Sequence, residues 1–460
     1  MTDILDELSW RGQIAVSTDL DDLRKELVSG PVTFYGGFDP TAPGLHIGNL
    51  VLLLTMRRLQ LAGHRPIGLV GGATGLIGDP SGKSAERTLN PREVVAGWVD
   101  RIRAEVGRFL DLTPGPAGAL VVSNLDWTES LSALEFLRDI GKHIPVSQML
   151  GRESVRARLD AGGISYTEFS YQILQAFDFL ELRRRHDCVL QLGGSDQWGN
   201  LVAGVDLIRR VTGDSVHALA TPLITRPDGT KYGKTEGGAV WLSPDLMSPY
   251  AFYQFWVNRT DAEVPGLLRV FTFRSRNEIE ELEREIIARP AARTAQRLLA
   301  DDVTTLVHGP EECARAVAAS QALFGQGDLH ALDERTLAAA LAEVPSAVIS
   351  AGRPAPGEDG SGGDGPGGDG SGGDSAGQGG LPRVADLMAA AGITASKSAA
   401  RRAIAEGGAY LNNVKVPDPD AVPQLSDLLY GRYLVLRRGK RTVGGVEIAR
   451  DPASHGSDLT

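Results

Sequence analysis

This 460-residue sequence contains little cysteine, no long apolar run and no recognisable secretory leader. Its two cysteines, Cys188 and Cys313, stand in unrelated contexts, which argues against a disulfide framework or a thiolate metal site and fits a reducing cytoplasm. No apolar run reaches the roughly 18 to 20 residues that span a bilayer. Residues 1–13 are acidic and lack the apolar core of a signal peptide. We therefore expect a cytoplasmic protein with no membrane segment.

An overall excess of positive charge is also missing, which at first argues against an RNA-binding protein. The net charge is -11, but residues 381–450 hold 11 Lys and Arg against 6 Asp and Glu, so this part carries +5 and the remainder -16. A basic module joined to an acidic body is typical of proteins that bind nucleic acid. The length of 460 residues predicts two or three domains.

Residues 357–380 contain no aromatic residue and no aliphatic side chain larger than alanine. Such a segment cannot bury a core, so we predict a flexible coil that reaches about 25–29 Å from end to end. Its Gly-Asp repeats lack the apolar residue of calcium-binding β-helix repeats, which argues against a calcium site. We place the whole linker at residues 351–380, between two folded bodies.

Short apolar runs alternate with helical patterns between residues 32 and 225, which predicts an α/β fold with a doubly wound, Rossmann-like parallel sheet. The expected strands are 32–38, 66–75, 118–125 and 187–194, and the expected helices are 49–63, 91–110 and 199–211. Residues 246–345 show helical patterns and no strand signal. After the linker, two short helices, a hairpin around Asn412-Asn413 and strands within 432–448 predict a small α+β domain.

The segment FDPTAPGLHIGN, residues 38–49, follows an expected strand and opens a long helix at about residue 47. A helix N-terminus offers unpaired N–H groups and the positive end of the helix dipole, which suit a polyphosphate. His46 and Asn49 lie three residues apart and face the same side of the first turn, and Gly48 leaves room for a nucleotide. Taken alone, the segment could equally be a plain strand-to-helix turn.

A second candidate, KYGKT at residues 231–235, lies in a polar, glycine-rich loop. Its two lysines could neutralise a departing pyrophosphate, although a solvated surface loop is the simpler interpretation of this segment alone. Between the two motifs, GGSDQWGN at residues 193–200 lies where a strand ends and a helix begins, the usual ligand edge of such a sheet. A P-loop in VGGATGLIGDPSGKS is excluded because its spacing requires glycine at Ile77.

Together, the two motifs resemble the HIGH and KMSKS signatures of class I aminoacyl-tRNA synthetases. Longer stretches, among them FYGGFDPTAPGLHIGN, FSYQILQAFDF and LQLGGSDQWGN, resemble the bacterial tyrosyl-tRNA synthetase family. The resemblance covers residues 1–350 and 381–450. It implies a catalytic domain at 1–245, a helical domain on the tRNA side at 246–350, the linker, an S-four-type RNA-binding domain at 381–450 and a tail at 451–460.

The same resemblance implies a tyrosine pocket. Tyr35 and Asp178 match the pair that hydrogen-bonds the substrate phenol, and phenylalanine would leave these buried groups unpaired at a cost in free energy. Tyr171, Gln175 and Asp178 are spaced so that one helix face presents all three, although an amphipathic core helix also explains that segment. The residues that match the surroundings of the substrate ammonium are Asp79, Tyr171, Gln175 and Gln197.

The implied reaction is attack of the tyrosine carboxylate on the α-phosphate of ATP, which needs positioning and charge stabilisation rather than a general base. Mg2+ is expected to arrive with ATP, while no protein metal site and no tightly bound cofactor are expected. The candidates around the reacting phosphates are Thr41, His46, Asn49, Lys83, Arg87, Lys231, Lys234 and Thr235. Further candidates for ATP are Gly48, Gly193, Asp39 and Asp196, of which Asp39 is also a candidate for the ammonium and Asp196 for the ribose.

Two positions depart from the family pattern. The family commonly has a polar side chain at position 36 that touches the ribose, and Gly36 has none. The last histidine of the signature is Asn49 here, which donates a hydrogen bond but carries no charge. Both departures concern the strength of nucleotide binding rather than the reaction.

The implied partners are L-tyrosine, ATP and tRNA(Tyr), bound by a homodimer whose interface region includes Tyr166. Basic residues after the linker would contact the RNA backbone, unless they form only a solvated basic face. They fall into two groups, Lys397, Arg401 and Arg402 at a helix start, and Arg437, Arg438, Lys440 and Arg441. In the body, the candidates for the acceptor stem are Arg152, Arg209 and Arg210.

Three other functions remain open on the sequence alone. A tryptophan-specific relative would share the class signatures and differ in the phenol-binding pair. An RNA-binding or splicing-helper protein would have lost catalysis, yet Asp79, His46, Lys231 and Lys234 are all present. A small-molecule adenylyltransferase would have no use for the basic C-terminal module.

Overall fold

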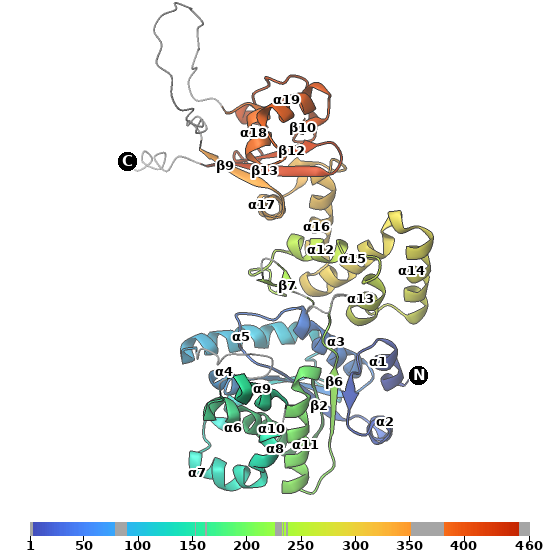
Figure 1. The fold of residues 1–460 in the computed structure, drawn as a ribbon. Coiled ribbons are helices and arrows are strands. Elements are labelled where there is room, and N and C mark those ends of the chain that lie inside the picture. Colours follow the sequence, from blue (N-terminus) through green and yellow to red (C-terminus); the bar gives the residue numbers. More distant parts are fainter. Residues whose placement is uncertain are drawn as a thin grey trace, which may run out of the picture. The chain divides into compact units, whose positions relative to one another are not determined.

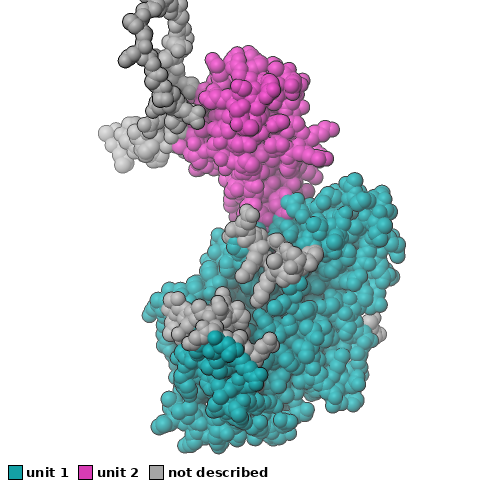
Figure 2. Space-filling model, viewed as in Figure 1, with its two compact units in different colours: residues 1–247, 255–303 teal, residues 248–254, 304–460 magenta. Residues whose placement is uncertain are grey.

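The computed structural model describes residues 3–78, 90–151, 153–161, 163–225, 232, 234–235, 238–350 and 381–449. The chain forms two compact units, which Figure 2 colours separately. Unit 1 comprises residues 1–247 and 255–303, and unit 2 comprises residues 248–254 and 304–460. The expected linker at 351–380 and the tail at 451–460 lie outside the described residues.

Unit 1 contains a six-stranded sheet in the order β1-β6-β5-β2-β3-β4 (Figure 1). Five strands run parallel, which confirms the predicted doubly wound sheet: β2 (Thr33–Phe38), β3 (Arg65–Val70), β4 (Leu120–Ser123), β5 (Cys188–Gly194) and β6 (His217–Thr221). The edge strand β1 (Val16–Ser17) pairs antiparallel with β6. The sequence patterns did not indicate β1 or β6, because β1 has only two residues and β6 has only three apolar residues, two of them alanine, between polar ends.

Long helices pack on this sheet because each presents an apolar stripe to it. They are α3 (Ile47–Leu61), α5 (Arg92–Phe109), α10 (Tyr166–His186) and α11 (Trp198–Val211). The Ser165 side chain caps the start of α10, which ends where Asp187 adopts a left-handed conformation with φ of 51°. Shorter helices of this region are α1 (Ile4–Trp10), α2 (Leu20–Ser29), α4 (Thr74–Ile77), α6 (Leu125–Thr128), α7 (Ala133–Glu135), α8 (Val146–Leu150) and α9 (Glu153–Ala161).

The stretch after residue 246 is helical, as predicted. Its helices are α12 (Pro249–Val257), α13 (Val264–Phe271), α14 (Arg276–Ala288), α15 (Thr294–His308), α16 (Pro310–Leu323) and α17 (Glu334–Ala342). Among the described residues, no helix is long and apolar enough to cross a membrane.

Unit 2 contains a five-stranded sheet in the order β11-β10-β12-β13-β9. Its predicted elements are present: α18 (Val384–Ala390), α19 (Lys397–Ala405), β10 (Ala409–Leu411), β11 (Val414–Lys415), β12 (Tyr433–Arg438) and β13 (Thr442–Ala449). The β10–β11 turn has positive φ at Asn412 (46°) and Asn413 (68°), the backbone that a two-residue hairpin turn requires.

The fifth strand, β9 (Ser346–Ser350), was not predicted and comes before the linker. It pairs in parallel with β13, from Ser346 opposite Gly445 to Ser350 opposite Ala449. Alternate β9 side chains, Ala347 and Ile349, pack on the core formed by α18, α19 and the other strands. The chain therefore leaves this sheet before the expected linker and re-enters the same unit after it.

Candidate active site

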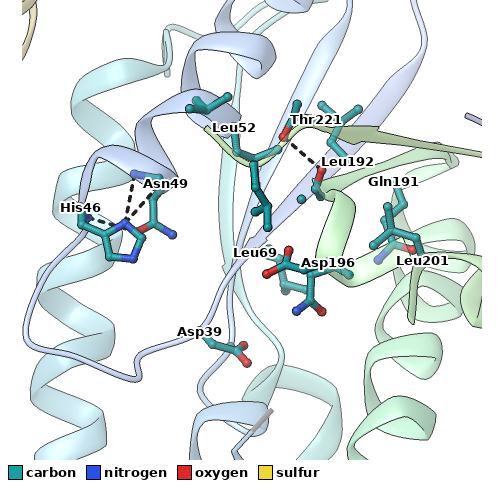
Figure 3. A pocket seen from close by; sticks show the side chains of 18 of the residues that line it. Asp39, His46, Asn49, Leu52, Leu69, Gln191, Leu192, Asp196, Leu201 and Thr221 are labelled. Atoms are coloured by element: carbon teal, nitrogen blue, oxygen red, sulfur yellow. Dashed lines mark hydrogen bonds between the residues drawn. The ribbon is translucent and has the colours of Figure 1, made fainter. Parts of the chain in front are cut away.

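A cavity of about 540 Å³ lies at the carboxyl ends of β2, β5 and β6, the edge at which parallel sheets bind ligands. Figure 3 shows Asp39 and Asp196 in its wall, with His46 and Asn49 together at the start of α3. The predicted site residues that line the cavity are Tyr35, Asp39, His46, Gly48, Asn49, Tyr171, Gln175, Asp178, Gly193, Asp196 and Gln197. Gln191 and Thr221 also line it and were not singled out from the sequence.

Tyr35 and Asp178 are the most buried polar pair in this wall, with exposed fractions of 1% and 2%. Within the described part of the chain, the Tyr35 hydroxyl has no hydrogen-bond partner. Burial raises the pKa of Asp178 to about 7, against two hydrogen bonds that lower it. These bonds come from Nδ2 of Asn124 to Oδ2 (3.0 Å) and from Nε1 of Trp127 to Oδ1 (2.9 Å). The cavity wall thus holds a phenol hydroxyl and a carboxyl that are both buried.

A chain of hydrogen bonds joins Asp178 to Asp39, a second carboxylate of the cavity wall. Asn124 also donates to the Thr74 hydroxyl (3.1 Å), which donates to Oδ1 of Asp39 (2.7 Å). The Tyr171 hydroxyl donates to Oδ2 of the same carboxylate (2.6 Å). Every link has a donor and an acceptor, so each fixes the orientation of the next side chain.

Sequence reasoning missed Thr74, Asn124 and Trp127. Asn124 follows β4 directly, and Thr74 follows β3, so both lie at the carboxyl edge of the sheet. That position was a usable signal, because polar residues just after parallel strands meet at the ligand edge.

Helix α10 presents Tyr171, Gln175 and Asp178 to the cavity from one face. The amide oxygen of Gln175 is buried and has no hydrogen-bond partner among the described residues. Gln197 approaches from β5's end, where its Oε1 accepts a hydrogen bond from Nδ2 of Asn200 (2.9 Å). The opposite face of α10 packs in the core through Ile173 and Leu180.

His46 and Asn49 form a reciprocal cap at the start of α3. His46 Nδ1 accepts from the backbone N–H groups of Gly48 (3.1 Å) and Asn49 (3.4 Å), and Asn49 Oδ1 accepts from the His46 N–H (3.1 Å). Burial lowers the pKa of His46, so its ring is neutral at pH 7. Since Nδ1 accepts, the proton of the neutral ring lies on Nε2. Asn49 therefore has a clear local role as the second half of the cap.

The family pattern suggested that a side chain at position 36 of β2 would reach the ribose, but this position faces α3. A Cβ on Gly36 would lie 2.7 Å from Sδ of Met56 in α3, whereas Gly37 lines the cavity. A side chain at position 36 would thus meet α3, so the expected loss of a ribose contact does not follow from this geometry.

A family model for class I tRNA synthetases (W and Y) matches residues 28–325. The chain belongs to this family. The tyrosine–tRNA ligase of Streptomyces avermitilis is 59% identical over 97% of this chain and 99% of its own length, and that of Thermobifida fusca is 56% identical over 97% and 99%. A C-terminally truncated mitochondrial tyrosyl-tRNA synthetase from Coccidioides posadasii has a TM-score of 0.62 at 30% identity, over 69% of this chain and 91% of that one. A model of the tyrosine–tRNA ligase SYY-like C-terminal domain matches residues 378–443.

Several candidates of this class I synthetase are not part of the described cavity. Thr41 is exposed and does not line it. Strand β7 (Lys234–Thr235) pairs with β8 (Gly238–Ala239), but the side chains of Lys234 and Thr235 are not described. The residues that lie outside the described part of the chain are Asp79, Lys83, Arg87, Arg152 and Lys231.

The basic candidates of the synthetase differ in their availability. Arg209 and Arg210 are exposed on α11, where Arg209 pairs with Asp206 (3.2 Å). Lys397 pairs with Asp386 (3.0 Å) and Arg401 with Asp420 (2.6 Å). The exposed members of the C-terminal groups are Lys397, Arg402, Arg438, Lys440 and Arg441, with Arg401 half-buried.

Arg437 corrects the expectation that its whole group faces RNA. It is only 8% exposed, stacks over the Tyr410 ring at 4.1 Å and donates to the Gly439 carbonyl (2.7 Å). Its guanidinium is therefore committed to packing within unit 2.

Proposed function

We propose that this chain is a cytoplasmic tyrosine–tRNA ligase. It activates L-tyrosine with ATP, forming tyrosyl-AMP and pyrophosphate, and then transfers tyrosine to the 3′ end of tRNA(Tyr). The observation that carries the proposal is the buried Tyr35–Asp178 pair at the base of a class I synthetase cavity. Relatives that match nearly the whole chain, at up to 59% identity, are tyrosine–tRNA ligases.

In this proposal, the Asp178 carboxylate accepts the hydrogen of the substrate phenol while the Tyr35 hydroxyl pairs with the phenol oxygen. Phenylalanine would fill the same space and leave the buried Tyr35 hydroxyl without a partner, which costs about 1–3 kcal/mol, and it would offer Asp178 no phenol hydrogen. Tryptophan has no phenol oxygen to pair with the Tyr35 hydroxyl, so this pair favours tyrosine over tryptophan as well.

The substrate ammonium lies between Asp39, Tyr171 and Gln175. The Asp39 carboxylate supplies negative charge, and the buried amide oxygen of Gln175 supplies a further acceptor. Gln197 also lines the cavity. Asp79 belongs to the same proposal, but it lies outside the described residues.

Adenylation follows from positioning. A carboxylate oxygen of tyrosine bonds to the α-phosphorus of ATP as the bond from that phosphorus to the bridging oxygen breaks, and pyrophosphate leaves. The neutral His46 ring offers its Nε2–H to the phosphates at the positive end of the α3 dipole, where Gly48 leaves room for the nucleotide, while Asp196 and Gly193 receive the ribose. Lys231, Lys234 and Thr235, with Lys83 and Arg87, would add charge, and Mg2+ would enter with ATP. In the second step, a ribose hydroxyl of tRNA attacks the tyrosyl carbonyl and releases AMP.

Binding of tRNA rests on unit 2 and on a second copy of the chain. The exposed cations of residues 397–441 would contact the RNA backbone, with Arg209 and Arg210 near the acceptor stem. Tyr166 is 67% exposed, and Leu134 (80%) and Val146 (58%) are exposed on neighbouring segments of unit 1. Such apolar exposure fits a homodimer interface.

The test is ATP–pyrophosphate exchange with purified protein and each amino acid in turn. Exchange that depends on tyrosine and is absent with phenylalanine and tryptophan supports the proposal. Exchange driven by tryptophan would establish the tryptophan-specific alternative, and no exchange with any amino acid would favour an RNA-binding protein without catalysis. Asp178→Ala should weaken tyrosine binding and leave ATP binding nearly intact.

A further inference from the structure

A buried carboxylate outside the cavity holds the backbone just before His46. Glu105 lies on α5, is 5% exposed and does not line the cavity. Its Oε2 accepts a hydrogen bond from the backbone N–H of Leu45 at 2.7 Å. Its Oε1 is buried with no hydrogen-bond partner in the described part of the chain. Burying a carboxylate costs free energy. The hydrogen bond that Glu105 accepts from Leu45, in the loop of residues 39–45 before α3, is therefore the contact that this buried group serves.

Helix α5 also contacts this loop at a second point, one helical turn before Glu105. Arg101 donates from Nη1 to the Pro43 carbonyl at 3.3 Å, and its other amino group lies 3.5 Å from the Asp245 carboxylate. Gly44 lies between the two contacted residues of the loop. A Cβ on Gly44 would come within 3.1 Å of Glu105 Oε1 and 3.0 Å of Leu246. The absence of a side chain at Gly44 therefore allows the close approach of α5.

The loop is also tied to the segment that follows the lysine motif, residues 240–246, which we call the return segment. The N–H of Ile47 donates to the Val240 carbonyl (3.0 Å), and the N–H of Leu242 donates to the Leu45 carbonyl (2.8 Å). His46 and Trp241 form the bridge between these bonds. Leu45 thus uses its N–H for Glu105 and its carbonyl for the return segment, so one residue joins α5 to that segment at the start of α3.

We propose that Glu105 is a positioning residue for the adenylation step, which it serves by fixing the Leu45 peptide and, through it, His46 and the return segment. The inference rests on the proposed function. Glu105 does not line the cavity, and most residues proposed for tyrosine stand on other elements, Tyr35 on β2 and Tyr171, Gln175 and Asp178 on α10. Asp39 does lie in the loop before α3, but its carboxylate is held by Thr74 and Tyr171 rather than by Glu105. Loss of the Glu105 contact should therefore affect the ATP-dependent step and spare tyrosine binding.

The decisive comparison is Glu105→Ala with Glu105→Gln. The glutamine retains an oxygen that accepts the Leu45 N–H, whereas alanine does not. We expect Glu105→Ala to lower kcat for pyrophosphate exchange about 10- to 100-fold, as small displacements of reacting groups do. Its Kd for tyrosine should stay within about twofold of wild type, and Glu105→Gln should retain kcat within about threefold.

Three outcomes would overturn the inference: wild-type kcat in Glu105→Ala, equal loss in both variants, or parallel loss of tyrosine binding. Absence of tyrosine-dependent exchange in the wild-type protein would instead contradict the proposed function itself. If Glu105→Ala does not fold, Gly44→Ala tests the same contact, because its Cβ pushes on Glu105 Oε1 and Leu246. It should lower kcat at unchanged tyrosine Kd, and unchanged kcat would count against the inference.

Discussion

Asp178 shows how one side chain sets both affinity and its pH dependence. Its pKa lies near 7 because burial opposes ionisation, while two fixed donors, Asn124 and Trp127, favour the ionised form. With a donor already on each oxygen, the ionised carboxylate is the form that accepts a phenol hydrogen. The protein without tyrosine therefore holds this carboxyl near the midpoint of its titration at neutral pH.

We expect tyrosine to bind about tenfold more tightly at pH 8 than at pH 6, because the ionised fraction of Asp178 rises by about that factor across a pKa near 7. His46 does not compete as an explanation, since burial moves its pKa below the usual value. Equilibrium dialysis of tyrosine across this range measures the effect. In Asp178→Asn, which cannot ionise, the profile should be flat, and a slope that persists there would assign the titration to another group.

Asn124→Ala should destabilise unit 1 by about 1–3 kcal/mol, because it removes a donor to Asp178 and an acceptor for the Ala73 N–H inside the fold. Urea unfolding gives the change in free energy, and tyrosine binding should weaken with it. Asn124→Asp is the informative partner, since a second carboxyl beside Asp178 should move the midpoint of tyrosine binding to higher pH. An unshifted midpoint would contradict the assigned contact.

The cavity side chains that the sequence predicted lie close together within single motifs. Tyr35, Asp39 and His46 share one such stretch, and Tyr171, Gln175 and Asp178 share one helix. The residues that hold them, Thr74, Asn124 and Glu105, come from separate segments whose approach depends on the sheet order. The prediction that Arg437 is exposed was wrong, because its charge alone does not reveal that its side chain stacks over a neighbouring ring.

At the scale of elements, boundaries marked by local chemistry were predictable and the pairing of distant strands was not. The start of α3 at Ile47 follows from the His46 cap, and the hairpin turn follows from Asn412-Asn413. Strand β9 gave no such signal, since five residues with one exposed face carry too little periodicity. Its partner, β13, lies on the far side of the linker.

Ile349→Asn should destabilise unit 2 and impair tRNA charging, because it places an amide against the apolar core that β9 completes. Tyrosine-dependent exchange should remain, since its cavity lies in unit 1. Val348→Asn is the matched control, as Val348 is adjacent in the same strand and 68% exposed. Thermal unfolding and both activity assays compare the pair, and similar behaviour of the two variants would contradict the packing of β9.

For the whole molecule, β9 changes what the Gly-Asp segment is expected to do. Residues 304–350 and 381–449 belong to one unit, so the basic module is joined to the chain by a strand pair as well as by the backbone. The length of residues 357–380 then matters little for holding the module in place.

Deleting half of residues 357–380 should leave tRNA charging within about twofold of wild type. The entropy of closing a flexible loop changes by only about 0.6 kcal/mol when its length is halved, and the change slightly favours the folded unit. Charging assays and thermal unfolding of unit 2 check this expectation. Deletion of β9, residues 346–350, serves as the comparison and should impair tRNA charging. A large loss of charging after shortening residues 357–380 would instead show that this segment holds the basic module in place.

The parallel pairing of β9 with β13 also sets the order in which the protein matures on the ribosome. Roughly a hundred residues separate the paired positions, and β13 is the last strand of the described chain. At about 5–20 residues per second, β9 leaves the exit tunnel about 5–20 seconds before its partner. Unit 1 is complete by then, whereas the sheet of unit 2 closes only after β13 has emerged. A newly made chain would therefore gain adenylation before β13 emerges to complete the sheet of its RNA-binding unit.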